Sequence, residues 1–232
     1  MNDKHVQSQF KPNLLHPFYF IRKGLYKVIS KKSVVIKGKL LDFGCGDKPY
    51  KALFDVDEYI GVDYFGEGHL HNKKEEIDFF YNGVNLPFKD SFFDSVISIE
   101  VFEHIFNLES IIPEIRRVMK PQAKLLITCP FVWNEHELPA DYARYTKYGL
   151  IHLLNKNGFK LISFEKKGNF IETLFQLIIL YFNPYLLKIP IFGFFISKVY
   201  CLVINLFGIF FSFLSHKRFD LYLSNVILVE KV

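Results

Sequence analysis

A tight turn built on two glycines is the first place where this sequence could do chemistry. The apolar run Leu40 to Phe43, which includes Asp42, leads directly into Gly44-Cys45-Gly46. Glycine allows backbone angles that a side chain forbids, and it lets a ligand approach the main chain closely. A second apolar run, Tyr59 to Val62, ends at Asp63. This layout is typical of a nucleoside pocket, in which the carboxylate accepts hydrogen bonds from ribose hydroxyls.

Two further polar residues follow a later apolar run. Residues 94–99 read as a buried strand that ends at Glu100, and His104 stands shortly after it. Because chemistry in open α/β sheets lies at the carboxyl ends of the strands, we expect both side chains near the site. His104 can be interpreted in two ways. It either orients the substrate or moves a proton, or it is a structural histidine without a role in the chemistry.

The loop of residues 130–146 also follows a predicted strand and holds the only tryptophan of the chain. Loops at this edge of a sheet carry binding and catalytic residues, so we expect it to cover a substrate site. The alternative for Asp141 and Arg144 is that they form a surface ion pair, which contributes little to stability. The alternative for His136 is that its side chain is solvated and has no role. The candidates are Trp133, His136, Asp141, Arg144 and Tyr145.

Several of these motifs together resemble one enzyme family. The order Leu-Asp-Phe-Gly-Cys-Gly, Gly-Val-Asp, Leu86-Pro87-Phe88, Phe93-Asp94 and Glu103-His104 is similar to that of the class I S-adenosylmethionine-dependent methyltransferases, and most similar to their small-molecule branch. Loops of the form His-x-x-Pro-x-Asp-Tyr-x-Arg-Tyr-Thr lie over the acceptor site in that family. The resemblance covers residues 38–165 and resumes at the C-terminal strand.

The resemblance implies an α/β fold with a Rossmann-like, seven-stranded, mostly parallel sheet and helices on both faces. It also implies S-adenosylmethionine as the cofactor. The glycine turn would shape the pocket for the methionine end, Asp63 would hold the ribose, and the segment 82–86 would flank the adenine. The expected cofactor-binding residues are Asp42, Gly44, Cys45, Gly46, Asp63, Asn82, Val84, Leu86 and Glu100.

Asn82 departs from the family pattern, in which this position is usually Asp and contacts the adenine amino group. The side-chain carbonyl of Asn82 can accept the same hydrogen bond, without the charge-assisted strength of a carboxylate. The alternative is that Asn82 only starts a turn with Gly83.

The reaction that the resemblance implies is an in-line displacement on a sulfonium, to which a protein contributes proximity and alignment. A hydroxyl acceptor also needs a base, for which His136 is the first candidate and His104 the second. Arg144 and Tyr145 would position an anionic or sugar-like acceptor, and Trp133 and Asp141 complete the expected substrate site. No metal ion is expected, and the pair His69-x-His71 reads as part of an exposed loop.

Two other functions stay open at this point. A nicotinamide oxidoreductase would want a third glycine in the first turn, where Pro49 stands nearby. A non-catalytic, membrane-associated protein that kept the fold is the other alternative, and Asn82 is the residue that favours it.

Helical elements are expected around these motifs. Apolar residues at helical spacing over 12–31, mixed with Arg and Lys, predict a basic amphipathic helix, which is either a lid over the cofactor pocket or a helix on an anionic membrane. Pro49 is expected in the first turn of a short helix that ends at Phe54. A second helix is expected over 108–119, in which a cap at Ser110 would place Pro113 in the first turn. Thr146 would cap the next helix, and Asn157-Gly158 would end it. The predicted strands are 39–43, 58–63, 77–81, 94–99, 123–129, 159–165 and 221–231.

The segment 170–214 is unusually apolar, and no Asp or Glu lies between Glu172 and Asp220. Asn183-Pro184 and Pro190 are expected to divide it into pieces shorter than the roughly 20 residues that a spanning helix needs. This favours helices that lie in a membrane interface. A two-pass hairpin, a buried helical subdomain and a dimer interface are the alternatives. Because the last strand must rejoin the sheet, this fold excludes a single crossing.

Composition sets the remaining expectations. The formal charge of +5 is scattered, so a nucleic-acid partner is not expected. Three scattered cysteines fit a reducing cytoplasm, and residues 1–9 do not resemble a signal peptide.

We expect a protein on the inner face of a membrane that acts on a small or lipid-linked acceptor, such as a saccharide or isoprenoid hydroxyl. Whether it forms a homo-oligomer stays open. The expected parts are an N-terminal helical lid (1–37), the S-adenosylmethionine-binding core (38–168), the apolar insert (169–218) and the final strand (219–232).

Overall fold

The computed structural model of the protein describes residues 10–64 and 76–232. The pair His69-x-His71 and the stretch 1–9 lie outside the described residues. The chain forms two compact units, each discontinuous in sequence. The first unit contains the described part of Met1–Lys27, Val132–Asn134 and Lys166–Ser224, and the second contains Val28–Phe131, Glu135–Glu165 and Asn225–Val232. These two units do not test the division into four parts that we expected from the sequence, so that division stays a prediction.

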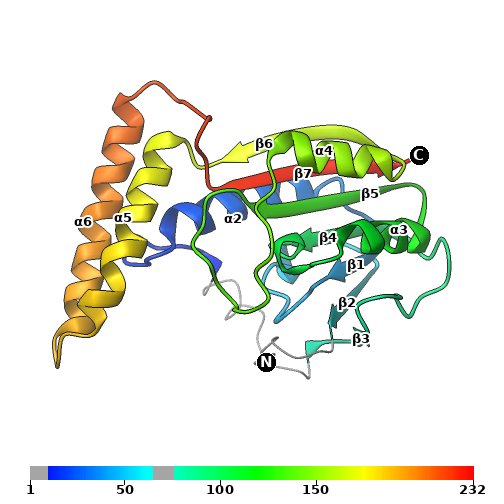
Figure 1. The fold of residues 1–232 in the computed structure, drawn as a ribbon, viewed down its shortest axis with the longest axis horizontal. Coiled ribbons are helices and arrows are strands. Elements are labelled where there is room, and N and C mark those ends of the chain that lie inside the picture. Colours follow the sequence, from blue (N-terminus) through cyan, green and yellow to red (C-terminus); the bar gives the residue numbers. More distant parts are fainter. Residues whose placement is uncertain (1–9, 65–75) are drawn as a thin grey trace. The chain divides into compact units, whose positions relative to one another are not determined.

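A seven-stranded sheet has the order β3-β2-β1-β4-β5-β7-β6, and this confirms the expected fold class (Figure 1). The pairs β1–β2, β1–β4, β2–β3 and β4–β5 are parallel. The last strand enters between β5 and β6, so the chain does return to the sheet after the apolar insert. The strands are β1 Lys39–Phe43, β2 Glu58–Tyr64, β3 Phe79–Tyr81, β4 Phe93–Ile99, β5 Met119–Pro130, β6 Phe159–Lys167 and β7 Ser224–Lys231.

The central strands are buried on both faces, which explains their continuous apolar runs. Leu41 and Phe43 on β1, Val96 on β4 and Ile127 on β5 are fully buried members of one core cluster. Helix α3 (Leu108–Val118) adds an apolar stripe to the same cluster. This core fixes the strand ends from which the candidate site residues project.

Helix α3 begins at Leu108, as expected, but its N-cap residue differs from the expected one. Asn107, not Ser110, occupies the N-cap, and its side chain makes no capping bond. Leu108 is already buried in the core, so the helix begins early enough to place it there. Pro113 therefore lies beyond the first turn and costs the helix one backbone hydrogen bond.

Helix α4 (Lys147–Lys156) follows the prediction. The Thr146 side chain accepts a hydrogen bond from the Gly149 N–H, and Gly158 after the helix has φ 75°. Two short 3₁₀ helices also lie in the described part of this unit. One is η1 (Lys51–Leu53), close to the short helix expected after Pro49, and the other is η3 (Phe102–His104).

Helix α2 (Tyr19–Ser33) begins later than the expected residue 12. Pro17 lacks an N–H and disfavours helical angles at the preceding residue, so the chain turns before it. The turn is held by bonds from Leu15 N–H to the Asn13 side chain and from Phe18 N–H to His16 Nδ1.

The apolar insert forms two long helices, α5 (Phe170–Leu187) and α6 (Gly193–Leu214). The expectation of shorter pieces is wrong, because Pro184 lies inside α5 and only the region of Pro190 separates the helices. With 18 and 22 residues, both are long and apolar enough to cross a membrane by length and composition. A capping box of Asn169 and Glu172 starts α5.

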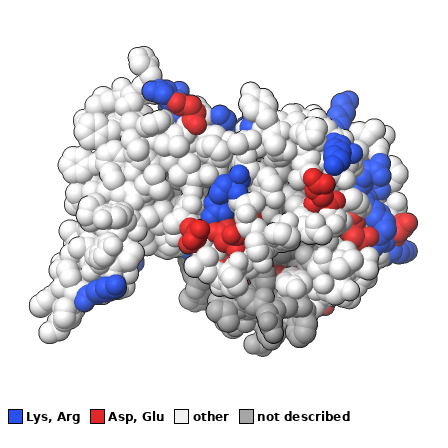
Figure 2. All heavy atoms as spheres, viewed as in Figure 1, with Lys and Arg blue, Asp and Glu red and all other residues white. Residues whose placement is uncertain are grey.

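These two helices carry their apolar side chains on the outside. Large apolar residues such as Phe194, Phe195 and Phe213 are 69%, 68% and 83% exposed. The face of α5 and α6 seen in Figure 2 shows few charged side chains. The buried residues are mostly small or polar, and they are Thr173, Gln176, Ile179, Asn183, Gly193, Ser197, Cys201, Asn205, Gly208 and Ser212.

Candidate functional site

The glycine turn after β1 adopts a backbone that other residues rarely take. Gly44 and Gly46 have φ values of 74° and 45°. A Cβ on Gly44 would lie 2.4 Å from a methyl carbon of Val101, so glycine is required there for space as well as for conformation. The Gly46 N–H donates a 2.7 Å hydrogen bond to Asp63 Oδ2, which joins the ends of β1 and β2.

A pocket of about 300 Å³ lies at these strand ends. It brings together four of the predicted site residues, Gly44, Asp63, Asn82 and His104. Its other lining residues were not singled out from the sequence, although most follow a predicted strand or lie in the loop 130–146. They are Tyr64, Tyr81, Gly83, Val101, Ile105, Phe106, Asn107, Ala140 and Tyr142.

Asp63 is buried, and both of its oxygens accept backbone hydrogen bonds. Oδ2 binds Gly46 N–H and Oδ1 binds Tyr64 N–H, each at 2.7 Å. A carboxylate has about four lone-pair sites, so capacity remains for hydroxyl donors in the pocket. This geometry fits the ribose of an adenosine-containing cofactor.

The segment expected at the adenine is only partly at the pocket. Asn82 lines it, but Asn82 Oδ1 accepts bonds at 3.0 Å from the N–H groups of Val84 and Asn85. This is the turn that was the alternative to an adenine contact. Val84 is 61% exposed, whereas Leu86 is buried in the core and its N–H donates to Glu114.

Asp42, at the end of β1, and Cys45, within the turn, are buried and do not line the pocket. The Tyr59 hydroxyl donates to Asp42 Oδ2, yet burial raises the pKa of Asp42 to about 7. Burial likewise raises the pKa of the Cys45 thiol. Neither side chain is among the residues that line the pocket, and a direct contact of either with the cofactor stays a prediction.

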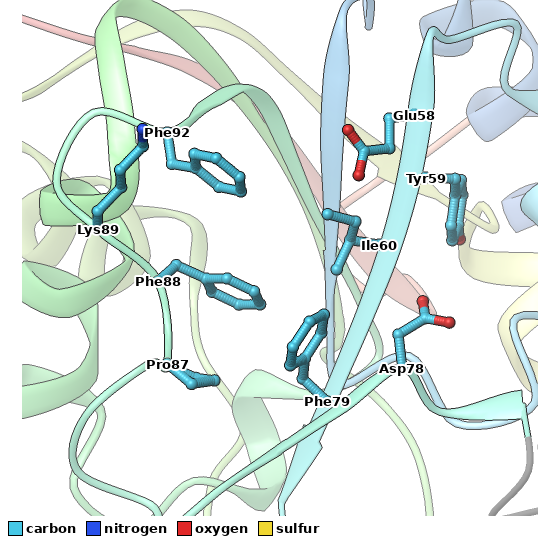
Figure 3. Close-up of a pocket in the computed structure, with 9 residues that line it drawn as sticks. All are labelled: Glu58, Tyr59, Ile60, Asp78, Phe79, Pro87, Phe88, Lys89 and Phe92. Atoms are coloured by element: carbon cyan, nitrogen blue, oxygen red, sulfur yellow. The ribbon is translucent and has the colours of Figure 1, made fainter.

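A second, larger hollow lies elsewhere on the second unit (Figure 3). It measures about 650 Å³ and is lined by Glu58, Tyr59, Ile60, Asp78, Phe79, Pro87, Phe88, Lys89 and Phe92. Glu58 is the first residue of β2, so this hollow is at the amino end of that strand. Because ligands of open α/β sheets bind at the carboxyl ends, we place the functional site in the smaller pocket.

Two glutamates are enclosed at the end of β4. Glu100 has φ 55°, and its N–H donates to Thr128. Glu103 is 0% exposed, and neither of its carboxyl oxygens has a hydrogen-bond partner among the described residues. Burial raises the pKa of Glu100 to about 7, and burial and then Glu100 raise that of Glu103 well above its ordinary value.

His104 and His136 meet beside Glu103. Their rings pack edge to face with centroids 4.7 Å apart. His104 Nδ1 is 2.7 Å from the Ala140 carbonyl oxygen, and His136 Nδ1 is 3.2 Å from Asp141 Oδ2. Both rings therefore have their Nδ1 atoms engaged with acceptors of the loop 130–146. The structure brings together the two candidate bases, which are distant in sequence.

Asp141 is not the surface ion pair that was the alternative for it. Its side chain is 1% exposed, and both oxygens bind Arg144, at 2.5 and 2.7 Å. Hydrogen bonds from Arg144 hold the pKa of Asp141 well below its usual range. Since Asp141 also binds the backbone and ring of His136, this geometry favours a positioning residue over a substrate contact.

The remaining two substrate candidates are not among the pocket residues. Trp133 belongs to the first unit, where its ring packs edge-on against Phe18 with centroids 5.6 Å apart. Tyr145 is half-buried against the core, and its carbonyl accepts a bond from Asn225. Their roles at the substrate stay predictions.

Comparison with known proteins decides the family. A methyltransferase domain model matches residues 41–127. An O-methyltransferase of Aspergillus nomiae is 30% identical over 165 residues, which cover 60% of this chain and 72% of that protein. The chain belongs to the class I S-adenosylmethionine-dependent methyltransferases. This confirms the family and the cofactor expected from the sequence, and it argues against the nicotinamide alternative.

Other similarities agree with this family. An uncharacterized protein of Methanocaldococcus jannaschii is 29% identical over 158 residues, or 66% of each chain, so the match spans just under two thirds of that relative. The fold also resembles phosphoethanolamine N-methyltransferase 2 of Haemonchus contortus in complex with S-adenosylmethionine, with a TM-score of 0.53 and 18% identity over 99% of this chain and 57% of that one. Relatives over shorter stretches are named as sterol and tRNA methyltransferases, so the names do not agree on one acceptor.

The Asp63 side chain should be needed for cofactor affinity. We expect Asp63→Ala to weaken S-adenosylmethionine binding at least tenfold, because it removes the acceptor for ribose hydroxyls and releases the Gly46 N–H. Isothermal titration calorimetry measures this, with Glu58→Gln in the larger hollow as the control of unchanged affinity. Equal affinity for Asp63→Ala and the wild type would contradict the assignment of the pocket.

The buried Asp42 should make stability depend on pH. Its folded pKa of about 7 exceeds the ordinary value of 3.8, so the folded state holds the proton more tightly and loses stability as the pH rises from about 4 to 7. Asp42→Asn cannot titrate and keeps an acceptor for Tyr59. We expect the free energy of unfolding of the variant, relative to the wild type, to rise by roughly 2–4 kcal/mol across this window. Urea unfolding at several pH values, without cofactor, measures the difference; a pH-independent difference would show that Asp42 is already ionised at low pH.

Proposed function

We propose that this protein is a membrane-embedded methyltransferase that transfers the methyl group of S-adenosylmethionine to a hydroxyl of a lipid-linked acceptor in the cytoplasmic leaflet. A saccharide or isoprenoid hydroxyl is the acceptor class that we favour. The observation that carries the proposal is the reversed polarity of α5 and α6, in which polar side chains face inward and apolar side chains face outward.

The inward polar side chains hold the two helices together. Asn183 Oδ1 accepts a 2.6 Å bond from the Ser197 hydroxyl, and Asn169 Nδ2 donates a 2.7 Å bond to Ser212. Small residues and side-chain hydrogen bonds at the contact, with apolar residues outside, are typical of helix pairs in a bilayer. A pair of helices in water would place these polar groups on the surface instead.

The N-terminal segment belongs to the same unit and adds to this polar interior. Gln176 donates to the Pro17 carbonyl at 2.8 Å, and Asn205 donates to the Leu14 carbonyl at 2.7 Å. These bonds satisfy backbone carbonyls of the turn before α2. Because of these bonds, we expect residues 14–17 to remain packed against α5 and α6 when the helices contact lipid.

The helix lengths fit a hairpin better than interfacial helices. At 1.5 Å per residue, helices of 18 and 22 residues are about 27 and 33 Å long, close to the roughly 30 Å core of a bilayer. An interfacial helix needs a polar face toward water, and here the polar faces point toward each other. Lys166, Lys167, Lys217 and Arg218 flank the open end of the hairpin, which the positive-inside tendency places in the cytoplasm.

At the pocket, the cofactor supplies an activated methyl group on a sulfonium, and the residues of the chain align the acceptor. His136 is oriented by Asp141, which fixes the proton on Nδ1 and leaves Nε2 as the basic nitrogen. Nε2 would take the proton of the acceptor hydroxyl as the new bond to carbon forms. Arg144 keeps Asp141 ionised and so supports this tautomer.

The hairpin predicts membrane binding that can be measured directly. We expect the full-length protein to float with lipid vesicles on a density gradient. The triple variant Phe207→Asp, Phe210→Asp and Phe213→Asp should lose flotation severalfold or more, because each charge costs about 2.5–3.5 kcal/mol in a bilayer core. The variant Val34→Asp and Tyr148→Asp, at exposed apolar sites of the second unit, is the control that should still float. A wild-type protein that stays at the bottom of the gradient as a stable dimer would instead favour the interface alternative.

Methyl transfer to a lipid is the second expected outcome. With radiolabelled S-adenosylmethionine and a total lipid extract, we expect label in the organic phase and a mass gain of one methylene on the acceptor. His136→Ala should lower this rate by roughly 10²–10⁴-fold with S-adenosylmethionine affinity unchanged, and the exposed His152→Ala should not change it. Cofactor binding without transfer to any component of the extract would favour the non-catalytic alternative.

A further inference from the structure

Three side chains beside the pocket have the composition of a metal site. A carboxylate oxygen of Glu103 and one ring nitrogen each of His104 and His136 all lie within 4.8 Å of one another. We infer that this Glu–His–His cluster binds a divalent first-row transition-metal ion of the Zn²⁺ or Mn²⁺ type. The inference deepens the proposed function at the same pocket, although the binding of the ion does not depend on it.

The orientation of both imidazoles favours a ligand role. A carbonyl oxygen only accepts hydrogen bonds, so His104 Nδ1 must carry the proton in its 2.7 Å contact with Ala140. The ionised Asp141 does the same for His136 Nδ1. In both rings the lone pair is therefore on Nε2. A carbonyl or carboxylate behind the Nδ1 atom of a histidine is the usual support of a metal-bound imidazole.

Glu103 supplies an independent observation. It is 0% exposed, and its two carboxyl oxygens are enclosed without a hydrogen-bond partner among residues 10–64 and 76–232. An ionised carboxyl group enclosed in this way is costly unless it binds a cation. Glu103 Oε1 lies 3.7 Å from His104 Nε2. Ligand bonds of about 2.0–2.2 Å in a tetrahedral site separate neighbouring donors by about 3.4 Å, so small rotations bring these atoms to ligand distances.

One further carboxylate, that of Glu137, lies close enough to complete the site. Glu137 Oε2 is 3.9 Å from His104 Nε2, and its side chain is 59% exposed, so it can move toward an ion. Glu100 Oε1 is also enclosed without a partner in the described part of the chain. The backbone N–H groups of Tyr142 and Ala143 donate to the Glu103 carbonyl at 2.8 and 3.2 Å, which ties η3 to the loop that carries His136. The cluster is thus held by the fold rather than assembled from mobile side chains.

The mixture of ligands selects the class of ion. Two imidazoles and one carboxylate suit zinc, manganese, iron, cobalt or nickel, whereas Mg²⁺ and Ca²⁺ prefer oxygen ligands alone. Methyl transfer needs no redox change, which favours Zn²⁺ or Mn²⁺.

Because His104 lines the pocket with Gly44 and Asp63, the ion would face the acceptor. It would bind the acceptor hydroxyl and lower its pKa, so that the proton would leave to solvent and the alkoxide would attack the methyl carbon, with S-adenosylhomocysteine as the leaving group. His136 would then act as a ligand in place of a base.

Metal binding can be tested without the acceptor. The full-length protein in detergent is stripped with EDTA and titrated with Zn²⁺ and with Mn²⁺ by calorimetry. We expect about one equivalent of at least one of these ions to bind the wild type and His152→Ala. Glu103→Gln and His136→Ala should lose at least tenfold in affinity, and Asp141→Asn should lose roughly 10–100-fold. Affinity for S-adenosylmethionine is measured for every variant, and it should stay unchanged in Glu103→Gln, which shows that the pocket is folded.

The outcomes separate this inference from the proposed function. No binding of either ion by the stripped wild type, or equal affinity in Glu103→Gln, overturns the metal site. Methyl transfer that continues at an unchanged rate after EDTA treatment also overturns it, and leaves the proposed function standing with His136 as the base. Specific binding of one ion with no methyl transfer to any lipid supports the site and overturns the proposed acceptor instead.

Discussion

The hydrogen bond from Gly46 N–H to the Asp63 carboxylate is the contact on which the candidate site depends. It links the ends of two adjacent parallel strands, β1 and β2, at the edge of the sheet where ligands bind. It is formed only because Gly44 and Gly46 take backbone angles that turn the chain sharply, and because Gly44 leaves room for Val101. The same carboxylate that shapes the turn then faces the pocket.

A second polar cluster adjoins this pocket through His104, and it illustrates how burial changes the chemistry of side chains. Glu103, His104, His136 and Asp141 are all largely enclosed, and their contacts form a chain from Arg144 to His136. In water such groups would be screened and independent. Enclosed by protein, each side chain sets the protonation or orientation of the next, so the cluster acts as one unit.

The helix pair α5 and α6 buries polar side chains, whereas the second unit buries apolar ones. The sheet buries Leu, Ile, Val and Phe, whereas the helix pair buries Asn, Ser, Thr and Gln. One chain therefore contains a unit with an apolar core and a pair of helices with polar side chains at their contact and apolar side chains on their surface. The chain enters the pair from β6 and leaves it into β7, two neighbours in the sheet, so the hairpin can be added without disturbing the strand order. This connectivity explains why a catalytic fold of this family tolerates an insert at this position.

Much of this architecture followed from local sequence. The strand runs, the glycine turn, the Thr146 cap and the return of the last strand depend on patterns within a few residues, and such patterns act through backbone geometry and burial alone. The predicted start of α2, the predicted cap of α3 and the predicted length of α5 were wrong. The ends of a helix and its tolerance of a residue such as Pro184 depend on what the helix packs against. The sequence by itself determined the family and the glycine turn, and it predicted Asp63 as a cofactor-binding residue. Only the tertiary structure decided that Asn82 forms a turn, that Leu86 belongs to the core, and that His104 and His136 meet at Glu103. These last facts depend on side chains from distant segments, and no local pattern records which of them become neighbours.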